Sequence, residues 1–488
     1  MAEENLREKA VSGILWSSVG RFGAIALNFL SNLVLARLLM PDDFGTVGML
    51  YVFIAISNEF VLAGFGSALI QKKSPTELDY SSVFWWNLGA SLVFYGILFC
   101  CAPAIARFYS IPALRMILRV QSLSMVILAF TLVPSFWLQK QFRFRELSMR
   151  QLVATGVGTV VGIGMALLGC GVWSLVASNL LGSLAGVLLL WRLCAWRPSR
   201  AFSWASLREL FRFGGLMALS SLFMSFYGNL QSLIIGKKFS ARELGYYGQA
   251  NKLENVPVQA LAQIINQVSF PLFSELQDER ARLLEAVRRN LKTTSYLIFP
   301  ALAMLAVVAR PLILFLYGAK WEPAVPYFQI LCLYGMVSPL NGLQANVSKS
   351  LGRSDIYFFS QLAMRVLGIV AILLAARYGI YGLIGTFVGL EYLFLLINGL
   401  INRQLIDYGL RKQASDLAGY YLLSLAVAVA AYAAGLILPL HPYGIMAIQI
   451  VLFVGMYVGL SHLFRLEGYI TCREIARNHL LKRKSSTI

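Results

Sequence analysis

Seven charged side chains lie within long apolar stretches of the chain, and their types suit ion or anion chemistry. They are four cations and three carboxylates: Arg21, Glu59, Arg119, Lys252, Glu254, Arg365 and Glu391. A charge near the centre of a bilayer is costly, so such a side chain normally faces a partner or a water-filled cavity. The cations could line a cavity for an anionic group, and the carboxylates could balance them or carry a coupling ion.

The depth of these charges follows from their distance to the nearest predicted helix end. At about 1.5 Å per helical residue, Arg21 and Glu59 both lie roughly 15 Å from the cytoplasmic side and could pair. Arg365 and Glu391 lie at matching depths in the second half, whereas Arg119 could extend to the membrane interface. Two interpretations stay open for the set: a cationic substrate cavity, or structural ion pairs between neighbouring helices.

The apolar stretches that must position these charges make up most of the chain. The 488 residues are 58% hydrophobic and 13% charged, whereas soluble proteins carry about 25% charged residues. Residues 151–191 contain no Asp, Glu, Lys or Arg, and a Gly169–Gly171 turn divides them. Because a transmembrane helix needs about 20 mostly apolar residues, this run predicts two spans joined by a tight turn.

Similar stretches recur along the chain and predict an all-α, polytopic membrane protein of about fourteen transmembrane helices. The expected spans are 12–36, 44–70, 80–106, 113–138, 148–169, 171–194, 212–236, 244–273, 293–317, 324–350, 355–376, 380–402, 416–438 and 442–464. The glycines of the fifth and sixth spans predict close helix packing. They are Gly156, Gly158, Gly162, Gly164, Gly182 and Gly186.

The distribution of basic residues orients these spans. With the N-terminus in the cytoplasm, 29 of the 42 Lys and Arg residues fall in cytoplasmic loops and tails, and nine fall outside. This asymmetry follows the positive-inside rule and predicts cytoplasmic N- and C-termini. The same rule accounts for the net charge of +19, so we expect no nucleic-acid binding. The six cysteines and three histidines lack metal-ligand spacing, so we expect no metal site.

An internal repeat relates the two halves of the chain. Residues 35–48 overlay 235–248 at a shift of 200, and residues 171–175 overlay 379–383 at a shift of 208. Together the overlays predict two six-helix lobes in parallel repeat, a plan typical of alternating-access transporters. The predicted division is 1–194 for the N-terminal lobe, 195–211 for a cytoplasmic amphipathic linker, 212–412 for the C-terminal lobe, 413–464 for two further helices, and 465–488 for a basic cytoplasmic tail.

Two loops and one acidic pair need separate interpretation. Residues 196–213 and 274–292 mix apolar and charged side chains, so each is either an interfacial amphipathic helix or a plain connector. Asp42 and Asp43 could hold a metal in a membrane glycosyltransferase, ligase or polymerase. A turn and helix start after Pro41 explains the same residues structurally, and the short outer loops favour that interpretation.

Three segments carry a family resemblance: Trp16–Arg21, Leu35–Gly45 and Gly169–Val176. They resemble bacterial Wzx-type polysaccharide flippases, of the colanic-acid-exporter-like or lipopolysaccharide biosynthesis subgroup. These proteins form one branch of the multidrug/oligosaccharidyl-lipid/polysaccharide exporter superfamily. The resemblance extends over essentially the full chain, including its length and helix count.

The resemblance implies two six-helix lobes around a central cavity that opens alternately to each side of the bacterial inner membrane. It implies that undecaprenyl-pyrophosphate-linked oligosaccharide is flipped for O-antigen, capsule or exopolysaccharide synthesis, with membrane lipids, a polysaccharide polymerase and chain-length machinery as partners of a monomer. Arg21 is the residue that best matches a basic cavity position. No P-loop is present, so we expect no nucleotide cofactor, and H+ or Na+ coupling stays open.

Two alternatives remain at this point. Another exporter of the superfamily would move lipid II or a drug in exchange for a cation. A membrane glycosyltransferase or polymerase would instead use the Asp42–Asp43 pair.

Overall fold

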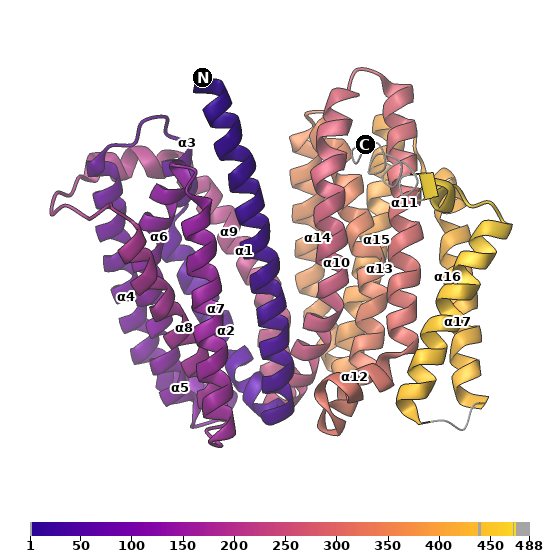
Figure 1. Ribbon diagram of the computed structural model, residues 1–488, viewed down its shortest axis with the longest axis horizontal. Coiled ribbons are helices and arrows are strands. Elements are labelled where there is room, and N and C mark those ends of the chain that lie inside the picture. Colours follow the sequence, from indigo (N-terminus) through magenta and orange to yellow (C-terminus); the bar gives the residue numbers. More distant parts are fainter. Residues whose placement is uncertain (1, 438–440, 472, 475–488) are drawn as a thin grey trace, which may run out of the picture. The chain divides into compact units, whose positions relative to one another are not determined.

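The computed structural model describes residues 2–437, 441–471 and 473–474, which form helices and short loops (Figure 1). Most of the predicted basic tail, residues 475–488, therefore lies outside the described residues. The chain divides into two compact units, Met1–Gly245 and Tyr246–Ile488. The lobe boundaries predicted at 194 and 212 differ from this division and stay a prediction.

The first unit contains nine helices and the start of a tenth. They are α1 (Ala2–Leu38), α2 (Pro41–Leu62), α3 (Phe65–Gln71), α4 (Glu77–Tyr109), α5 (Leu114–Gln121), α6 (Leu123–Lys140), α7 (Phe144–Leu167), α8 (Val172–Leu193), α9 (Trp204–Lys238) and α10 (Ala241–Glu275). α7 packs against both α1 and α8, while α9 packs against α2, α3 and α4. A capping box starts α4, because Thr76 Oγ1 accepts from Asp79 N at 3.2 Å and Asp79 Oδ2 accepts from Thr76 N at 2.8 Å.

The described part of the second unit holds the rest of α10 and seven further α-helices. They are α11 (Arg280–Val307), α12 (Ala309–Tyr317), α13 (Val325–Ser350), α14 (Ser354–Ala375), α15 (Gly379–Ile406), α16 (Leu410–Ile437) and α17 (Pro442–Leu463), with short 3-10 segments at Ala319–Ala324 and Ala376–Tyr378. α13 packs against α11 and α15, and α16 packs against α11 and α17.

Each of the fourteen predicted spans falls on one helix or on two consecutive helices. Within the residues described, ten helices are long and apolar enough to cross a membrane, and an eleventh if α11 and α12 together form one span. α10 and α13 are not among them. The protein is therefore a multi-pass α-helical membrane protein, and the count of about fourteen stays a prediction.

Three spans predicted as continuous helices, 44–70, 113–138 and 293–317, are each divided between two helices. Ala63 and Gly64 have φ of 41° and 72°, which ends α2 in the left-handed region before α3 begins. Gly64 meets Gly214 of α9 backbone to backbone, a contact that side chains would prevent. α11 and α12 are bent by 71°, because Pro311 cannot donate to the carbonyl four residues earlier.

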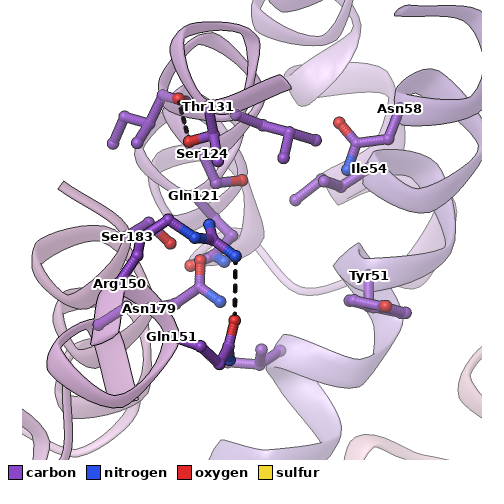
Figure 2. A pocket seen from close by; sticks show the side chains of 14 residues that line it. Tyr51, Ile54, Asn58, Gln121, Ser124, Thr131, Arg150, Gln151, Asn179 and Ser183 are labelled. Atoms are coloured by element: carbon purple, nitrogen blue, oxygen red, sulfur yellow. Dashed lines mark hydrogen bonds between the residues drawn. The ribbon is translucent and has the colours of Figure 1, made fainter. Parts of the chain in front are cut away.

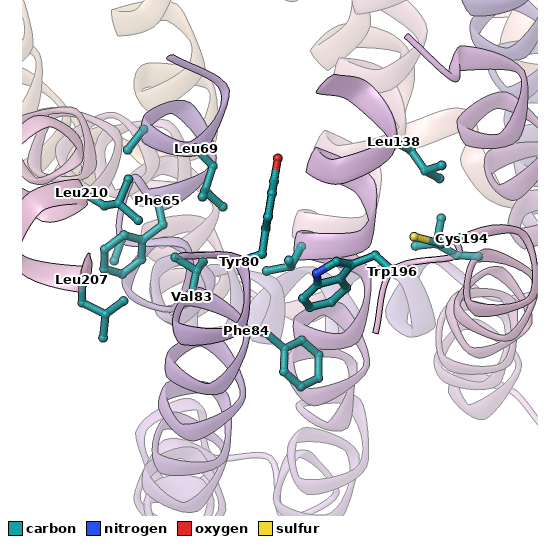
Figure 3. Packing of buried hydrophobic residues seen from close by; sticks show 14 residues of the cluster. Phe65, Leu69, Tyr80, Val83, Phe84, Leu138, Cys194, Trp196, Leu207 and Leu210 are labelled. Atoms are coloured by element: carbon teal, nitrogen blue, oxygen red, sulfur yellow. The ribbon is translucent and has the colours of Figure 1, made fainter. Parts of the chain in front are cut away.

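The connection between α8 and α9 is a docked segment. Residues 194–203 form no helix, so an interfacial helix over 196–213 is wrong, and only the part from Trp204 onward is helical. Trp196 is buried with Tyr80 and Phe84 of α4 in an apolar cluster (Figure 3), and its Nε1 donates to Glu77 Oε2 at 2.8 Å. Residues 274–292 likewise form the end of α10, a turn and the first turns of α11.

The repeat found in the sequence is present in the helix boundaries. α1 ends at Leu38 and α2 begins at Pro41, and 200 residues later α9 ends at Lys238 and α10 begins at Ala241. Gly171 and Gly379, paired by the second overlay, both have positive φ, at 53° and 82°, and stand at the starts of α8 and α15. The two overlays therefore mark equivalent structural positions.

Candidate functional site

The glycines of α7 and α8 bring these two helices into backbone contact. A Cβ at Gly182 would lie 2.6 Å from the Ala154 carbonyl oxygen, and one at Gly158 would lie 2.8 Å from the Ser178 carbonyl oxygen. Ser178 Oγ donates to the Gly158 carbonyl at 2.7 Å. Close packing is thus confirmed at Gly158, Gly162, Gly182 and Gly186, whereas Gly156 and Gly164 face open space.

A polar pocket lies beside this hairpin, wholly within the first unit (Figure 2). Its volume is about 260 Å³, slightly below the range of drug-sized ligand pockets. Eight of the fourteen lining side chains are polar: Asn58, Gln121, Ser124, Thr131, Arg150, Gln151, Asn179 and Ser183. The other lining residues are Val47, Tyr51, Ile54, Ile127, Leu128 and Ala154.

The lining residues recur at helical spacing on five helices, so the helix faces build the pocket. On α2 the lining residues lie at positions 47, 51, 54 and 58. A second set runs from the end of α5 along α6, at positions 121, 124, 127, 128 and 131. Asn179 and Ser183 are four residues apart on α8, so they share one face. Apolar side chains cover most of the other faces of these helices, as a membrane bundle requires.

Arg150 supplies the only charge among the residues that line the pocket. Its Nη2 donates to Gln151 Oε1 at 3.1 Å, while its Nε is buried without a hydrogen-bond partner. Asn58 Oδ1 and Gln121 Oε1 are also buried without partners. Buried polar atoms normally find partners, so hydrogen-bonding capacity is left unused beside the pocket.

The cations predicted for the first lobe lie elsewhere. Arg21 is exposed, and no ion pair joins it to Glu59 anywhere in the described chain. The structure therefore does not form the pair that the similar depths of the two residues allowed. Arg119 lies with its guanidinium carbon 4.1 Å from the Phe99 ring centroid, and its Nε donates to the Phe99 carbonyl at 3.3 Å. This contact fixes Arg119 between α4 and α5.

The charges predicted for the second lobe fall into two groups. Lys252 is exposed on α10, whereas Glu254 is fully buried and neither of its carboxyl oxygens has a hydrogen-bond partner. Glu391 accepts from Asn341 Nδ2 at 2.9 Å. Arg365 lies within electrostatic range of Glu391. The structure thus brings Glu254, Glu391 and Arg365 into one region, and their roles in coupling or pairing stay proposals.

Sequence reasoning assigned Arg150 to a cytoplasmic loop and missed the pocket. The missed signal was polar rather than charged: amides and hydroxyls recur at helical spacing within apolar spans. Arg150 is six residues beyond the start of α7, which places it about 9 Å along the helix. The charge-free run 151–191 begins one residue later. Counting charges therefore assigned Arg150 to the loop before the membrane span, although it lies on α7 and lines the pocket.

The acidic pair Asp42–Asp43 has a structural role. Asp43 Oδ2 accepts from Met40 N at 3.0 Å and caps the start of α2, while Asp42 Oδ2 accepts from Arg242 Nε at 2.8 Å. Among the described residues, no group of three or more His, Cys, Asp or Glu side chains could hold a metal. The turn-and-helix-start interpretation therefore explains both carboxylates.

Comparison with known protein families identifies the family of this chain. The family described as "Polysaccharide biosynthesis protein" matches residues 34–326, which is more than half of the chain. The chain belongs to this family. The match contains all of α2 to α12 and so includes the pocket. The relationship to Wzx-type polysaccharide transporters that the sequence predicted is confirmed.

Curated relatives of the family cover most of the chain. The lipopolysaccharide biosynthesis protein WzxC of Escherichia coli K12 is 26% identical over 445 residues, 89% of each chain. The teichuronic acid biosynthesis protein TuaB of Bacillus subtilis is 24% identical and covers 84% of this chain and 85% of its own. The succinoglycan biosynthesis transport protein ExoT of Rhizobium meliloti is 27% identical over 72% of this chain and 71% of its own.

Solved structures share the fold at low sequence identity. The lipid II flippase MurJ in an inward closed conformation matches with a TM-score of 0.73 and 16% identity, over 92% of this chain and 98% of its own. An inward-facing multidrug resistance transporter of the MATE family and MOP superfamily matches with a TM-score of 0.62 and 17% identity, over 81% and 98%. The fold is that of MOP-superfamily membrane transporters.

Proposed function

We propose that the protein flips an undecaprenyl-pyrophosphate-linked oligosaccharide across the bacterial inner membrane by alternating access. The lipid-linked sugar enters from the cytoplasmic leaflet, both termini lie in the cytoplasm, and the flipped unit then feeds a polysaccharide polymerase. The names of the relatives support this substrate class, because they refer to lipopolysaccharide, teichuronic acid and succinoglycan. The protein itself transports and carries out no glycosyl transfer.

The observation that carries the proposal is the polar pocket inside a lobe of membrane-spanning helices. Sugar hydroxyls both donate and accept hydrogen bonds, which suits the amides of Asn58, Gln121 and Asn179 and the hydroxyls beside them. Arg150, which lines the pocket, would pair with an acidic substituent or a phosphate through its guanidinium group. A charged sugar head group cannot cross hydrocarbon unaided, so such a lining supplies the contacts that water provides outside.

Loss of the gene tests the function. We expect a deletion strain to accumulate the lipid-linked oligosaccharide in the inner leaflet and to lose the corresponding surface polysaccharide. The accumulated lipid, extracted and identified by mass spectrometry, would name the sugar repeat. Unchanged surface glycan without accumulation would refute the assignment. If the deletion strain instead became sensitive to drugs, a multidrug exporter of the superfamily would be favoured. If it accumulated lipid II, a role in peptidoglycan synthesis would be favoured.

Variants in the pocket test the site within the function. We expect Arg150→Ala to reduce the export rate about tenfold or more, because a lost charged hydrogen bond costs about 1.5–3 kcal/mol. Arg192→Ala is the matched control, since Arg192 is an exposed arginine at the end of the same hairpin. Equal export by Arg150→Ala and Arg192→Ala at equal protein abundance would remove the pocket from the mechanism.

A further inference from the structure

The second unit holds a buried carboxyl group that the proposed pocket does not use. Glu254 on α10 is fully buried, and both of its carboxyl oxygens lack hydrogen-bond partners. An ionised carboxylate in such a place would lack both solvation and compensating donors, which is among the costliest states for a side chain in a membrane protein. A carboxyl group at this position therefore needs a bound cation.

A glycine on the facing helix makes room for this carboxyl group. A Cβ at Gly335 of α13 would collide with Glu254 Oε1 and would lie 2.8 Å from both Leu302 and Val258. Gly335 is also fully helical, where glycine is unfavourable by roughly 0.5–1 kcal/mol relative to alanine. The space is thus kept for the carboxyl group at the expense of helix stability.

A second carboxyl group contacts the same facing helix. Glu254 lies against Gly335 of α13, and about 9 Å along that helix Asn341 Nδ2 donates to Glu391 Oε1 of α15 at 2.9 Å. The other titratable or charged groups that face the two glutamates come from three helices: Tyr247 on α10, Cys332 and Tyr334 on α13, and Arg365 on α14. Two carboxyl groups thus share a region with a cationic side chain, Arg365, which interacts with Glu391.

A polar path leads from this pair toward one end of the lobe. Asn341 Oδ1 accepts from Asn398 Nδ2 at 3.2 Å, and one turn farther Gln344 Nε2 donates to Gln413 Oε1 at 3.0 Å. Gln413 Nε2 donates to the Tyr408 carbonyl at 2.9 Å, and Tyr408 Oη donates to Asp416. Glu391, Asn398 and Asn402 share one face of α15 over about 16 Å. Predicted topology places the Asp416 end in the cytoplasm.

We propose that Glu254 and Glu391 form a proton-binding site in the second lobe, with one exchangeable proton carried by Glu254 and access along the Asn341–Gln413 polar path. A proton is the cation favoured by the contacts, because it needs one acceptor oxygen, whereas a bound Na+ needs several oxygen ligands at once. With the proton on Glu254, the remaining charge on Glu391 is balanced by Arg365. The use of this proton to drive export rests on the proposed function, whereas the site itself does not.

Infrared spectroscopy of the purified full-length protein in detergent tests the site without any substrate. We expect the carbonyl band of a buried carboxylic acid at neutral pH in the wild type and its loss in Glu254→Gln, whose neutral amide imitates the protonated acid. Glu322→Gln is the matched control, because Glu322 is an exposed glutamate of the same unit paired with Arg310, and it should keep the band. Superimposable spectra of the wild type and Glu254→Gln would overturn the proposal.

Two further variants keep the test decisive if Glu254→Gln does not fold. Glu391→Gln should retain a carboxylic acid band but change the pH at which it disappears, and Gly335→Ala should displace the Glu254 carboxyl group and shift its frequency. Neither change would occur if Glu254 were ionised. The spectra are repeated with choline in place of Na+. A band that appears only without Na+ would show a Na+ site and overturn the assignment to a proton.

The readouts separate this proposal from the proposed function. Loss of export in Glu254→Gln together with loss of the band would support proton-driven export. A normal band in the wild type together with an unaffected surface glycan in the deletion strain would keep the proton site and refute only the polysaccharide role.

Discussion

Asp42 and Arg242, 200 residues apart in the sequence, are joined by a 2.8 Å hydrogen bond between Oδ2 and Nε. They occupy the same position in the two copies of the internal repeat, directly after the first residue of α2 and of α10. The surrounding glycines pack reciprocally. A Cβ at Gly45 would collide with the Ala241 carbonyl, and a Cβ at Gly245 would collide with the Pro41 carbonyl. The two copies of this loop, both within the first unit, therefore pack against each other reciprocally.

The first prediction concerns this reciprocal contact. We expect Gly45→Ala to reduce the amount of folded protein severely, because the neighbouring carbonyl belongs to the backbone and cannot rotate away. Gly89→Ala is the control, since a Cβ at Gly89 meets nothing within 4 Å. Arg242→Ala should change stability by less than about 1 kcal/mol, since its ion pair is exposed. Size-exclusion chromatography of detergent-solubilised protein measures all three variants. Equal recovery of Gly45→Ala and Gly89→Ala would contradict the contact.

The second prediction concerns the α7–α8 hairpin that carries Arg150. Gly182→Val should separate the helices and lower the melting temperature, because its side chain meets the backbone of α7 at Ala154 and Gly158. Gly164→Ala faces open space, and replacing a helical glycine by alanine there should stabilise the protein by roughly 0.5–1 kcal/mol. Thermal unfolding followed by tryptophan fluorescence compares them. A Gly182→Val protein as stable as the wild type would show that close approach is unnecessary.

The third prediction concerns pH and the charge cluster where α3 ends. Lys72 Nζ lies 3.0 Å from Asp79 Oδ2 and 3.2 Å from Glu209 Oε2. Partial burial alone would lower the pKa of Lys72, but hydrogen bonds to Asp79 and Glu209 outweigh it and raise the pKa above its ordinary 10.5. The stabilisation is therefore complete below pH 10.5 and is lost as the pH rises through the higher folded-state value.

The variant Lys72→Met isolates this contribution. We expect it to be about 1–2 kcal/mol less stable than the wild type at neutral pH, since one partner carboxylate is buried. The difference should shrink above pH 10.5, because both proteins then lack the charge. Melting temperatures of the two proteins across alkaline pH provide the measurement. A difference that stays constant over that range would rule out the charge as its source.

The fourth prediction concerns the attachment of α16 to α11. Asp416 accepts from Arg288 Nε and Nη2, both at 2.8 Å, and from Tyr408 Oη at 2.9 Å. Because the Asp416 side chain is only 6% exposed, Asp416→Asn should cost about 2 kcal/mol or more by leaving these donors badly matched. Asp407→Asn removes an exposed pair with Lys412 and should cost less than about 1 kcal/mol. Limited proteolysis after α15, together with melting temperature, distinguishes them.

The sequence predicted the helical membrane fold, the position of nearly every helix and the repeat, because apolar run length and glycine spacing depend on local sequence. It could not predict the breaks at Gly64 and Val308, which arise from a helix contact with Gly214 and from the loss of one backbone donor at Pro311. Neither effect changes the hydropathy of the span. Both 44–70 and 293–317 therefore read as continuous helices.

The candidate site was harder to predict than the fold. A search for charges found Glu254 and Glu391, which the structure does bring together, but it also selected Arg21, which is exposed. It missed Arg150 because depth was counted from a predicted helix end, and an error of a few residues moves a side chain from a loop into a pocket. The neutral amides of the pocket carry no charge signal, so only their spacing on helix faces could have identified them.

The reciprocal packing of the two repeat copies has a consequence for the history of this chain. Each glycine faces a backbone carbonyl of the other copy, and every residue type carries that carbonyl, so no substitution at position 241 or 41 makes room for a side chain at position 45 or 245. Positions 45 and 245 should therefore keep glycine across related genes, whatever residues stand at 41 and 241.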